Sequence, residues 1–414
     1  MRVLLTTVGS RGDVEPLVGL AAAVRELGSE VRVCAPPDED FAKLLARIDV
    51  PLVPLSPRTV RSVVAGTKRP TAEDAFRFAA ELVAARFQTL TTAAQGCDAL
   101  LATGLLPAGA RDVAEKLGIP YVFACFHSYG LPSRDRPPLG RPGTPSSEGE
   151  TDNRVLWELD AQGVNAMYRE PLNTHRAEIG LPPVDDVRHH VVTERPWLAA
   201  AGPLCPADDV TELELVRTGA WILPDERPLP DGLEAFLEAG EPPVYVGFGS
   251  MAAYLPEDLA RVAIEAVRAL GRRIVLARGW AELAPIDEAG DCFVLGEVNQ
   301  QQLFRRVAAV VHHGGAGTTT TAALAGVPQM IVPQIADQPH WAARVAELGI
   351  GAAHEGSRPT VESLTAVLAV VLAPATEKRA RTTASTIRTD GATVAAKLLR
   401  DAADRNRYQA RPTV

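Results

Sequence analysis

The sequence lacks the features that mark several large classes of protein. Its 414 residues include only five cysteines, an odd number without a CxxC pair. This disfavours a disulfide framework or a structural zinc site and favours a reducing, cytoplasmic compartment. There is no apolar run of about 18 residues, and the N-terminus lacks the charged and apolar regions of a signal peptide. Neither membrane insertion nor secretion is therefore expected.

Basic character is also missing. The net charge is -9 and no Lys/Arg-rich run occurs, whereas a nucleic-acid binder usually presents a basic face. Nucleic acid is therefore not an expected partner. Hydrophobic residues make up 46% and charged residues 22% of the chain, as in an ordinary globular protein. The length suggests about two or three domains.

Short apolar runs alternate with helical patterns in both halves of the chain. In the first half the predicted strands are 3–8, 31–35, 99–103 and 120–125, and the predicted helices are 14–27 and 108–117. The pattern restarts near residue 243, with predicted strands 244–248, 273–277, 293–295, 308–312 and 330–332 and a predicted helix 259–270. Alternation of this kind predicts an α/β protein with two doubly wound parallel sheets in tandem.

Irregular segments interrupt this pattern at three places. The Pro-rich segment 202–230 is predicted to be a linker between an N-terminal domain, 1–201, and a C-terminal domain, 231–385. The segment 131–152 is dense in Pro, Gly, Ser and charge, and 56–74 is similar but shorter. A loop as long as 131–152 within a compact domain is usually functional or disordered.

The strongest local signal is His312-His313-Gly314-Gly315-Ala316-Gly317-Thr318, which follows a predicted strand and opens a helix rich in small residues. A glycine-rich turn at a helix N-terminus offers unsatisfied N–H groups and the positive end of the helix dipole, which suit a diphosphate. In this interpretation His312 adds a hydrogen-bond donor. The alternatives are a tight turn without a ligand and a metal site, which is less favoured because adjacent side chains rarely point at one ion.

A second polar segment, Pro333-Gln334-Ile335-Ala336-Asp337-Gln338-Pro339, lies just past another predicted strand. Ligands of open α/β sheets bind at the carboxyl ends of strands. The side chains of Gln334, Asp337 and Gln338 are suited to binding sugar hydroxyls. Taken alone, the segment is better explained as a polar turn capped by prolines.

In the first half, Gly9-Ser10-Arg11-Gly12-Asp13-Val14-Glu15-Pro16 joins the first predicted strand to the first predicted helix. Asp13 is either the N-cap of that helix, which the local sequence favours, or a general base at an interdomain cleft. The loop lacks the full GxGxxG pattern, which argues against a dinucleotide-binding dehydrogenase.

The triplet Asp38-Glu39-Asp40 has the DxD spacing that holds a divalent metal in one class of glycosyltransferases. It stands directly before an apolar helical pattern. An acidic helix start is therefore the better interpretation.

Taken together, these segments resemble a known family. In chain order they are Gly9–Pro16, Gly247-Phe248-Gly249-Ser250, Arg278-Gly279-Trp280, Glu297-Val298-Asn299, His312–Thr318 and Asp337-Gln338-Pro339. They are similar to those of the two-Rossmann-domain (GT-B) glycosyltransferases of family 1 that decorate bacterial natural products. Four segments resemble the subgroup acting on glycopeptide antibiotics of the vancomycin and teicoplanin type: Ala114–Pro120, Ile179–Val184, Thr218–Leu223 and Val310–Thr318. The resemblance is weakest over 56–74 and 126–152, where such enzymes differ in acceptor contacts.

The resemblance implies a role for each motif. Asp13 would be the catalytic base in an acceptor-binding domain, in a loop where Ser10, Arg11 and Gly12 contact sugar or acceptor. Trp280 would stack on the nucleotide base, and the backbone of Val298 would read its edge. The diphosphate would be held by Ser250, His312, Gly314, Gly315, Ala316, Gly317 and Thr318, and the donor sugar by Gln334, Asp337 and Gln338. The C-terminal segment 386–414 would form a helix that returns to the N-terminal domain.

These assignments predict an inverting, metal-independent glycosyltransferase without a cofactor. Asp13 would accept the proton of an acceptor hydroxyl as its oxygen attacks the anomeric carbon, and helix N–H groups would stabilise the departing diphosphate. The expected donor is UDP-glucose or UDP-N-acetylglucosamine, with a dTDP-deoxyaminosugar as an alternative. The expected acceptor is a glycopeptide aglycone or its attached sugar, and the expected state is a monomer.

Three other interpretations stay open at this point. The first is a glycosyltransferase with a macrolide, polyketide or other lipophilic acceptor. The second is a nucleotide-sugar 2-epimerase on the same fold, and the third is a non-catalytic nucleotide-binding protein in which Asp13 only caps a helix.

Overall fold

The computed structural model describes residues 1–56, 58–65, 71–104, 106–141, 144–145, 147–249 and 256–409. The chain divides into two compact units. Unit 1 comprises Met1–Ala200, Pro206–Leu223 and Arg388–Val414, and unit 2 comprises Ala201–Cys205 and Pro224–Ile387.

The segment 202–230, predicted as a linker, is not a separate element. Its residues 206–223 belong to unit 1. The physical reason is the burial of Trp221, which is 3% exposed in the core of unit 1 and donates a hydrogen bond from Nε1 to Thr218 Oγ1 at 3.0 Å. A buried aromatic ring of this size anchors the surrounding chain.

In the described part of the chain, unit 1 is built on a parallel sheet of seven strands in the order β3-β2-β1-β4-β5-β6-β7. The strands are β1 (Arg2–Thr6), β2 (Glu30–Ala35), β3 (Leu52–Pro54), β4 (Ala99–Thr103), β5 (Tyr121–Cys125), β6 (Trp197–Leu198) and β7 (Val216–Arg217). The helices are α1 (Arg11–Glu26), α2 (Glu39–Ala46), α3 (Val60–Ala65), α4 (Ala72–Ala93), α5 (Ala110–Leu117), α6 (Asn153–Glu178), α7 (Val187–Val192) and α15 (Gly391–Gln409), with a 3-10 turn η1 (Ser128–Gly130).

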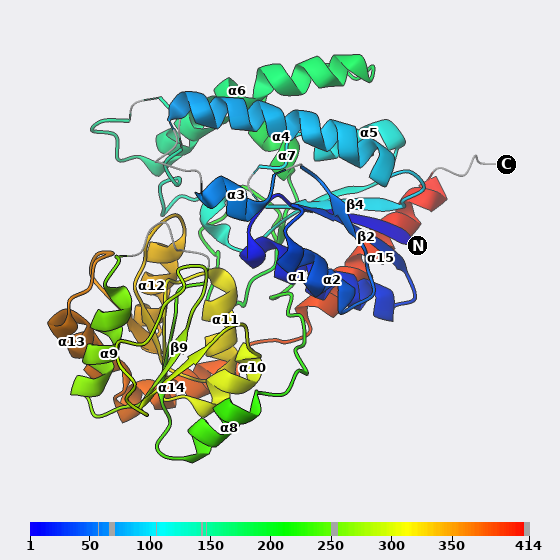
Figure 1. The fold of residues 1–414 in the computed structure, drawn as a ribbon. Coiled ribbons are helices and arrows are strands. Elements are labelled where there is room, and N and C mark those ends of the chain that lie inside the picture. Colours follow the sequence, from blue (N-terminus) through cyan, green and yellow to red (C-terminus); the bar gives the residue numbers. More distant parts are fainter. Residues whose placement is uncertain are drawn as a thin grey trace. The chain divides into compact units, whose positions relative to one another are not determined.

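Helices cover both faces of this sheet (Figure 1). On one face α1 packs against α15, from the far end of the chain, and both contribute to a core that includes Val18, Trp221 and Leu399. On the other face α4 packs against α6 and α5. The apolar stripe of α1 is therefore buried between the sheet and a helix that the sequence places more than 300 residues later.

Unit 2 is built on a parallel sheet whose described strands number six, in the order β10-β9-β8-β11-β12-β13. They are β8 (Val244–Gly247), β9 (Ile274–Ala277), β10 (Cys292–Leu295), β11 (Ala309–His312), β12 (Gln329–Ile331) and β13 (Gly351–Ala353). The helices are α8 (Asp231–Glu238), α9 (Leu259–Ala269), α10 (Gln300–Leu303), α11 (Ala316–Ala325), α12 (Gln338–Glu347), α13 (Val361–Val371) and α14 (Pro374–Ala384), with a 3-10 turn η3 (Phe304–Arg306).

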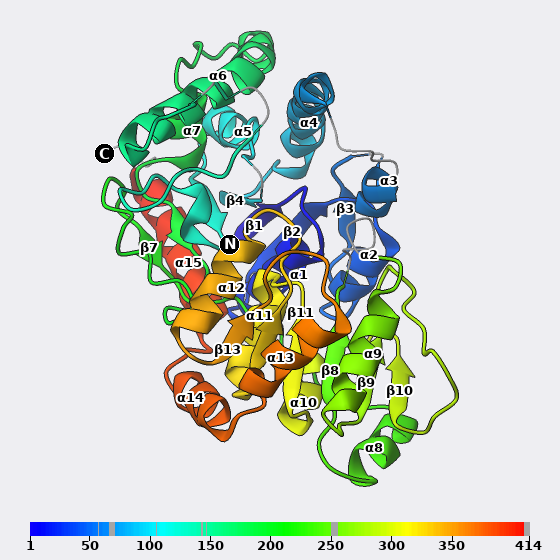
Figure 2. The same cartoon turned by 90° about the vertical axis from the view of Figure 1, so that its left-hand side faces the viewer.

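Two apolar clusters lie on opposite faces of the unit 2 sheet. One joins the sheet to α9 and α13, which Figure 2 shows side by side. The other joins Val310 on β11 to Leu233 on α8 and Ala322 on α11. Each strand thus alternates its side chains between two buried faces, as a sheet covered on both sides requires. Within the described ranges, no helix is both long and apolar enough to cross a bilayer.

The predicted fold class is confirmed, since both sheets are parallel and doubly wound. The predicted strand 99–103 is observed at those residues, and the others are found within a few residues of their predicted positions. The acidic triplet begins a helix, as predicted: Asp38 is the N-cap of α2. Its carboxylate also accepts the backbone N–H groups of Val60 and Arg61 in α3, at 2.8 and 3.2 Å.

The long helices α4 and α6 were not predicted. The 26-residue helix α6 carries many charged residues and an internal Pro171, which weaken its helical pattern. Its buried side chains, which include Trp157, Asp160 and Arg176, are largely not aliphatic. The buried charges Asp160 and Arg176 interrupt the apolar face of α6, and this weakens its hydrophobic periodicity.

Within the segment 131–152, residues 136 and 141 hold the chain against α6 and Asp209, whereas residues 147–152 are exposed. Trp157 Nε1 donates to the carbonyl of Arg136 at 2.8 Å, and Arg141 pairs with the buried Asp160 at 2.6 Å. Arg136 also pairs with Asp209 at 2.6 Å. Residues 142, 143 and 146 lie outside the described residues. Polar contacts therefore fix the part of this segment that precedes residue 142 on unit 1.

A buried ion-pair network joins α5, α6 and α7. Among the described residues, Asp112, Glu115 and His190 form the one group close enough to bind a metal ion, but the guanidinium of Arg176 lies among them and donates to both carboxylates. Burial acts to raise the pKa of Asp112, yet hydrogen bonds and charge from His190 and Arg176 outweigh it, and the pKa is lowered. Arg176 Nε also donates to Pro182 O at 2.6 Å. The subgroup segments 114–120 and 179–184 therefore meet in a structural network.

Replacing Asp112 with Ala should destabilise the protein strongly. Asp112 is fully buried and Arg176 nearly so, and the loss of one member of a buried pair typically costs about 3–5 kcal/mol. The matched control is Glu115→Ala, which removes the other carboxylate on Arg176 but is 39% exposed and should cost less than about 1 kcal/mol. Thermal denaturation of both variants tests this prediction, and an equal loss of stability in the two variants would contradict it.

Candidate active site

In unit 1 the winding of the sheet reverses between β1 and β4, which are neighbours in space but not consecutive in sequence. Ligand sites of open α/β sheets lie beyond the carboxyl ends of strands at such a point. Asp13 lies there, with its carboxylate against the glycines that follow the two strands. A Cβ on Gly9 would be 1.9 Å from Asp13 Oδ2, and a Cβ on Gly104 would be 3.7 Å from Oδ1. Only a residue without a side chain at position 9 permits this placement.

Asp13 is not the N-cap of α1, so the capping interpretation is wrong. The N-cap is Ser10, whose extended backbone lets its carbonyl accept the N–H groups of Asp13 and Val14 at 2.9 and 3.0 Å. Asp13 stands in the first turn, where its charge also complements the helix dipole. Arg11 pairs with Glu15 at 2.8 Å, and Gly12 is exposed. The predicted acceptor loop is therefore the first turn of a helix.

In unit 2 the winding reverses between β8 and β11, and the glycine-rich turn directly follows β11. Gly315 is the N-cap of α11. The first-turn N–H groups of Ala316, Gly317 and Thr318 have no acceptor within an α-helix and sit at the positive end of its dipole. This arrangement offers an anion site at the strand edge where a nucleotide would be expected.

His312, predicted to donate to a phosphate, is instead part of the interior. Its side chain is fully buried, Nε2 lies 3.0 Å from Gln329 Oε1, and Nδ1 accepts the backbone N–H of Gly314 at 3.1 Å. Because Nδ1 is an acceptor, the ring proton is on Nε2. Both nitrogens are engaged, and burial lowers the pKa of His312 to about 3. Neither His312 nor the Gly314 N–H is available to a diphosphate.

The neighbouring His313, which the sequence prediction did not select, lies beside Gly249 and Gly315, in the loops that follow β8 and β11. Its ring lies 3.5 Å from where a Cβ on Gly249 would stand and 2.6 Å from where one on Gly315 would stand. Within the described part of the chain, its buried Nδ1 has no hydrogen-bond partner. Burial lowers the pKa of His313 to about 4 against the opposing charge of Asp337, so the ring is neutral at pH 7. The paired histidines gave no sequence signal for which one is the interior residue.

The motifs expected at the nucleotide base follow adjacent strands. Trp280 comes after β9, and its backbone N–H donates to Gly249 O at 2.9 Å. A Cβ on Gly279 would lie 2.7 Å from that oxygen, so the two loops touch backbone to backbone. Val298 comes after β10 and is partly buried against the core. Ser250, predicted at the diphosphate, lies outside the described residues.

The residues expected at the donor sugar form one tight turn after β12. Gln338 is 4% exposed, and its Oε1 accepts the backbone N–H groups of Gln334 and Ile335 at 2.7 and 3.1 Å. This oxygen is therefore used to build the turn. Gln334 Nε2 donates to Val332 O at 3.0 Å.

Asp337 is the residue of this turn whose side chain is best placed to meet a ligand. It is half-buried and precedes α12 as its N-cap. Its Oδ2 accepts a hydrogen bond from Trp341 Nε1 at 2.7 Å, and Trp341 is buried in the unit core. Trp341 was not predicted as a site residue, although residues four apart on a helix are neighbours and its spacing from Asp337 could have indicated the contact. The indole fixes the orientation of the carboxylate.

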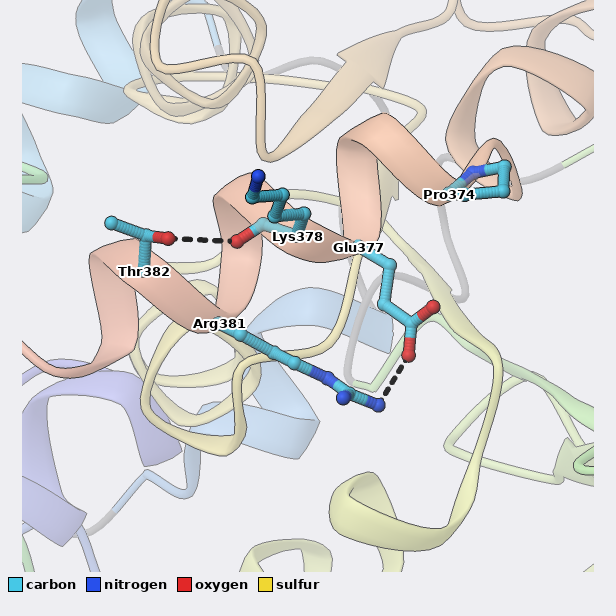
Figure 3. Close-up of a pocket in the computed structure, with 5 residues that line it drawn as sticks. All are labelled: Pro374, Glu377, Lys378, Arg381 and Thr382. Atoms are coloured by element: carbon cyan, nitrogen blue, oxygen red, sulfur yellow. Dashed lines mark hydrogen bonds and ion pairs between the residues drawn. The ribbon is translucent and has the colours of Figure 1, made fainter.

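A shallow hollow on α14, shown in Figure 3, is not part of either site. It is lined by Pro374, Glu377, Lys378, Arg381 and Thr382. Arg381 pairs with Glu377 across it and packs against Gly326, at the C-terminal end of α11. The hollow is thus at the opposite end of α11 from the glycine-rich turn, and it contains none of the predicted site residues.

Comparison with known proteins decides the family. Residues 3–129 match the glycosyltransferase family 28 N-terminal domain, and residues 282–396 match the erythromycin biosynthesis protein CIII-like C-terminal domain. The chain is 58% identical over 407 residues to glycosyltransferase GtfE of Amycolatopsis orientalis, covering 96% of this chain and 97% of that protein. It is 55% identical over 419 residues to vancomycin aglycone glucosyltransferase of the same organism, covering both in full. The chain therefore belongs to the glycosyltransferase family that includes GtfE and vancomycin aglycone glucosyltransferase.

Solved structures place the glycosyltransferase in the GT-B fold. The glycosyltransferase of kitacinnamycin aligns with a TM-score of 0.72 at 22% identity, covering 97% of this chain and 98% of that one. Glycosyltransferase VinC in complex with dTDP aligns with a TM-score of 0.67 at 22% identity, covering 98% and 100%. The resemblance inferred from the motifs is therefore confirmed at the level of family and fold.

The glycosyltransferase should lose activity when Gly9 is replaced with Ala. The added methyl would overlap the Asp13 side chain and force it into another rotamer, and misplacement of a reacting group by about 1 Å can lower kcat about 100-fold. The control is Gly290→Ala, an exposed position where an added Cβ would meet no atom within 4 Å and activity should be kept. Steady-state kinetics with a thermal midpoint for each variant tests this, and similar kcat values would contradict it.

Stability should fall in mild acid because His312 is buried without charge. Its pKa is about 3 when folded against 6.5 as the ordinary value, so between these pH values the unfolded chain binds a proton that the folded chain does not. The free energy of unfolding should therefore decrease as pH falls below about 6.5, by up to ~1.4 kcal/mol per pH unit from this residue. Above pH 6.5 the residue contributes no pH dependence.

The thermal midpoint of the wild type and of His312→Asn, followed from pH 8 to pH 4.5, isolates this contribution. The wild type should be the more stable at pH 8, and its advantage should shrink as the pH falls. An advantage that stays constant over this range would show that His312 is not buried as a neutral ring.

Proposed function

We propose that this glycosyltransferase transfers the sugar of UDP-glucose or UDP-N-acetylglucosamine to a hydroxyl of a glycopeptide antibiotic aglycone or of a sugar already attached to it. The observation that carries the acceptor is the 55% identity, over the full length of both chains, to vancomycin aglycone glucosyltransferase. In unit 1, hydrogen bonds and ion pairs fix the segment 131–141 in place, and a fixed segment can offer a large acceptor a defined binding surface.

The donor assignment is supported by the polar groups that lie beyond the carboxyl ends of the strands in unit 2. The first-turn N–H groups of α11 and the neutral His313 provide donors for a diphosphate, and the fixed carboxylate of Asp337 provides acceptors for sugar hydroxyls. In this proposal His313 replaces His312 as the phosphate contact. A dTDP-sugar is the second candidate, since a relative 49% identical over 390 residues is named dTDP-epi-vancosaminyltransferase.

The proposed chemistry is a single in-line displacement with inversion. Asp13 takes the acceptor proton while the acceptor oxygen forms its bond to the anomeric carbon and the bond from that carbon to the diphosphate breaks. A carboxylate is too weak a base to ionise a hydroxyl in advance, so proton transfer accompanies attack. Charge develops on the diphosphate, where the helix N–H groups and His313 stabilise it without a metal ion.

A mass-spectrometric assay tests donor and acceptor together. The protein is incubated with vancomycin-type aglycone and, separately, UDP-glucose, UDP-N-acetylglucosamine and a dTDP-deoxyaminosugar. A gain of one hexose or one N-acetylhexosamine supports the proposal. A gain with the dTDP-sugar alone would overturn the donor, and no gain despite nucleotide binding would overturn the acceptor.

Replacing Asp13 with Asn should abolish most turnover while leaving the fold intact. Asn is close in shape but cannot accept the proton, and loss of a general base typically costs about 10²–10⁴ in kcat. Because Ser10 is the N-cap, the helix keeps its cap and the thermal midpoint should change little. Glu26→Gln, an exposed carboxylate in the last turn of α1, is the control and should keep full kcat. Equal kcat in wild type and Asp13→Asn would exclude Asp13 as the base.

A further inference from the structure

We infer that Gln329 is a positioning residue for the donor diphosphate, because its side chain holds His312 in the orientation that fixes the backbone of Gly314 ahead of α11. The inference rests on the proposed donor site. Gln329 itself contacts no predicted ligand atom, since its side chain is fully buried.

A continuous chain of hydrogen bonds runs from Gly314 to α11 through these two side chains. The Gly314 N–H donates to His312 Nδ1 at 3.1 Å, His312 Nε2–H donates to Gln329 Oε1 at 3.0 Å, and Gln329 Nε2 donates to Thr319 O at 3.2 Å. The chain begins before the first turn of α11 and ends within the helix. It therefore links the glycine-rich turn, strand β12 and helix α11.

Strand register explains why Gln329 meets His312. Val310 is opposite Gln329 and His312 is opposite Ile331 on the paired strands β11 and β12, so the two polar side chains are diagonal neighbours on one face of the sheet. The same face is otherwise an apolar layer that includes Val310, Ala322 and Val327. An aliphatic side chain would satisfy packing at position 329. The amide instead supplies an acceptor to the His312 Nε2–H, which would otherwise be buried without a partner, and an additional donor to the Thr319 carbonyl.

The amide also selects the tautomer of His312. With its oxygen toward Nε2, Gln329 requires the ring proton on Nε2, and Nδ1 is then the acceptor that the Gly314 N–H needs. The opposite tautomer would set two donors against each other at Gly314. Gln329 thus acts on the turn through the ring, without touching it.

Gly314 in turn supports the sugar side of the proposed site. Its φ is +93°, and a Cβ there would lie 2.7 Å from the side chain of Ile331 and 3.3 Å from Gln338 O. Gln338 builds the turn that presents Asp337. A displacement of Gly314 would therefore disturb both the first-turn N–H groups of α11 and the support of the Asp337 turn.

Binding of UDP and of dTDP by titration calorimetry, with the thermal midpoint of each variant, tests the inference. Gln329→Met keeps the length of the side chain but removes both hydrogen bonds, and it should weaken binding of the proposed UDP about tenfold. Donor KM should rise by the same factor while acceptor KM changes less than about twofold. Gln329→Glu keeps an acceptor for His312 Nε2–H and should recover part of the affinity.

Two variants of His312 separate the contributions of its two ring nitrogens, Nδ1 and Nε2. His312→Asn can place its oxygen near the position of Nδ1 and keep the contact to Gly314, so binding should weaken less than about threefold. His312→Gln reaches the position of Nε2 but leaves the Gly314 N–H without its acceptor, so binding should weaken about tenfold.

The matched control is Asn173→Leu in unit 1, where an amide also bridges two backbone groups, the N–H and C=O of Val184. It should lower the thermal midpoint without changing nucleotide affinity. Unchanged affinity in Gln329→Met and His312→Gln, with wild-type binding intact, would overturn the inference and leave the donor site standing. A wild-type protein that binds neither nucleotide would instead overturn the proposed donor site.

Discussion

The winding of each parallel sheet reverses once, between β1 and β4 in unit 1 and between β8 and β11 in unit 2. At a reversal the chain leaves two neighbouring strands in opposite directions, so no connection crosses above their carboxyl ends. Both candidate sites occupy these positions. Asp13 lies against Gly9 and Gly104 at the first, and the glycine-rich turn lies at the second. The position of the chemistry thus follows from the order of the strands.

Two kinds of glycine contact make these positions usable. Gly9 leaves space for a carboxylate, since any side chain there would occupy the position of Asp13. Gly279 and Gly249 instead allow two loops to approach backbone to backbone, so that Trp280 is fixed by its own N–H. In both cases the missing side chain lets another group come close, and no ligand contact of the glycine itself is needed.

Buried polar groups determine the shape of both units beyond the sheets. In unit 2, the Gly314, His312 and Gln329 chain ties a turn to the interior, and in unit 1 Asp112 and Arg176 tie α5 to α6. Low dielectric makes each of these contacts costly to break and allows one arrangement only. Sequence segments that resemble the glycopeptide subgroup, 114–120 and 179–184, are explained by the second network. The resemblance of these segments to the glycopeptide subgroup is therefore better explained by a shared structural network than by shared contacts to the acceptor.

The sequence by itself missed the short strands β3, β6, β7 and β13, but it determined the fold class, the family, the loops that carry Asp13, Trp280 and Asp337, and nine of the thirteen described strands. These are local properties: apolar periodicity, helix-ending glycines and short motifs lie within a few residues of one another. It did not reveal α6, because buried charges on that helix, Asp160 and Arg176, have their partners elsewhere in the chain, at Arg141 and Asp112. Tertiary structure alone decided which of two adjacent histidines is interior, that Ser10 rather than Asp13 caps α1, and that 206–223 belongs to unit 1. Each of these depends on which strand or helix lies across from a residue, and pairing between distant segments leaves no periodic trace in one sequence.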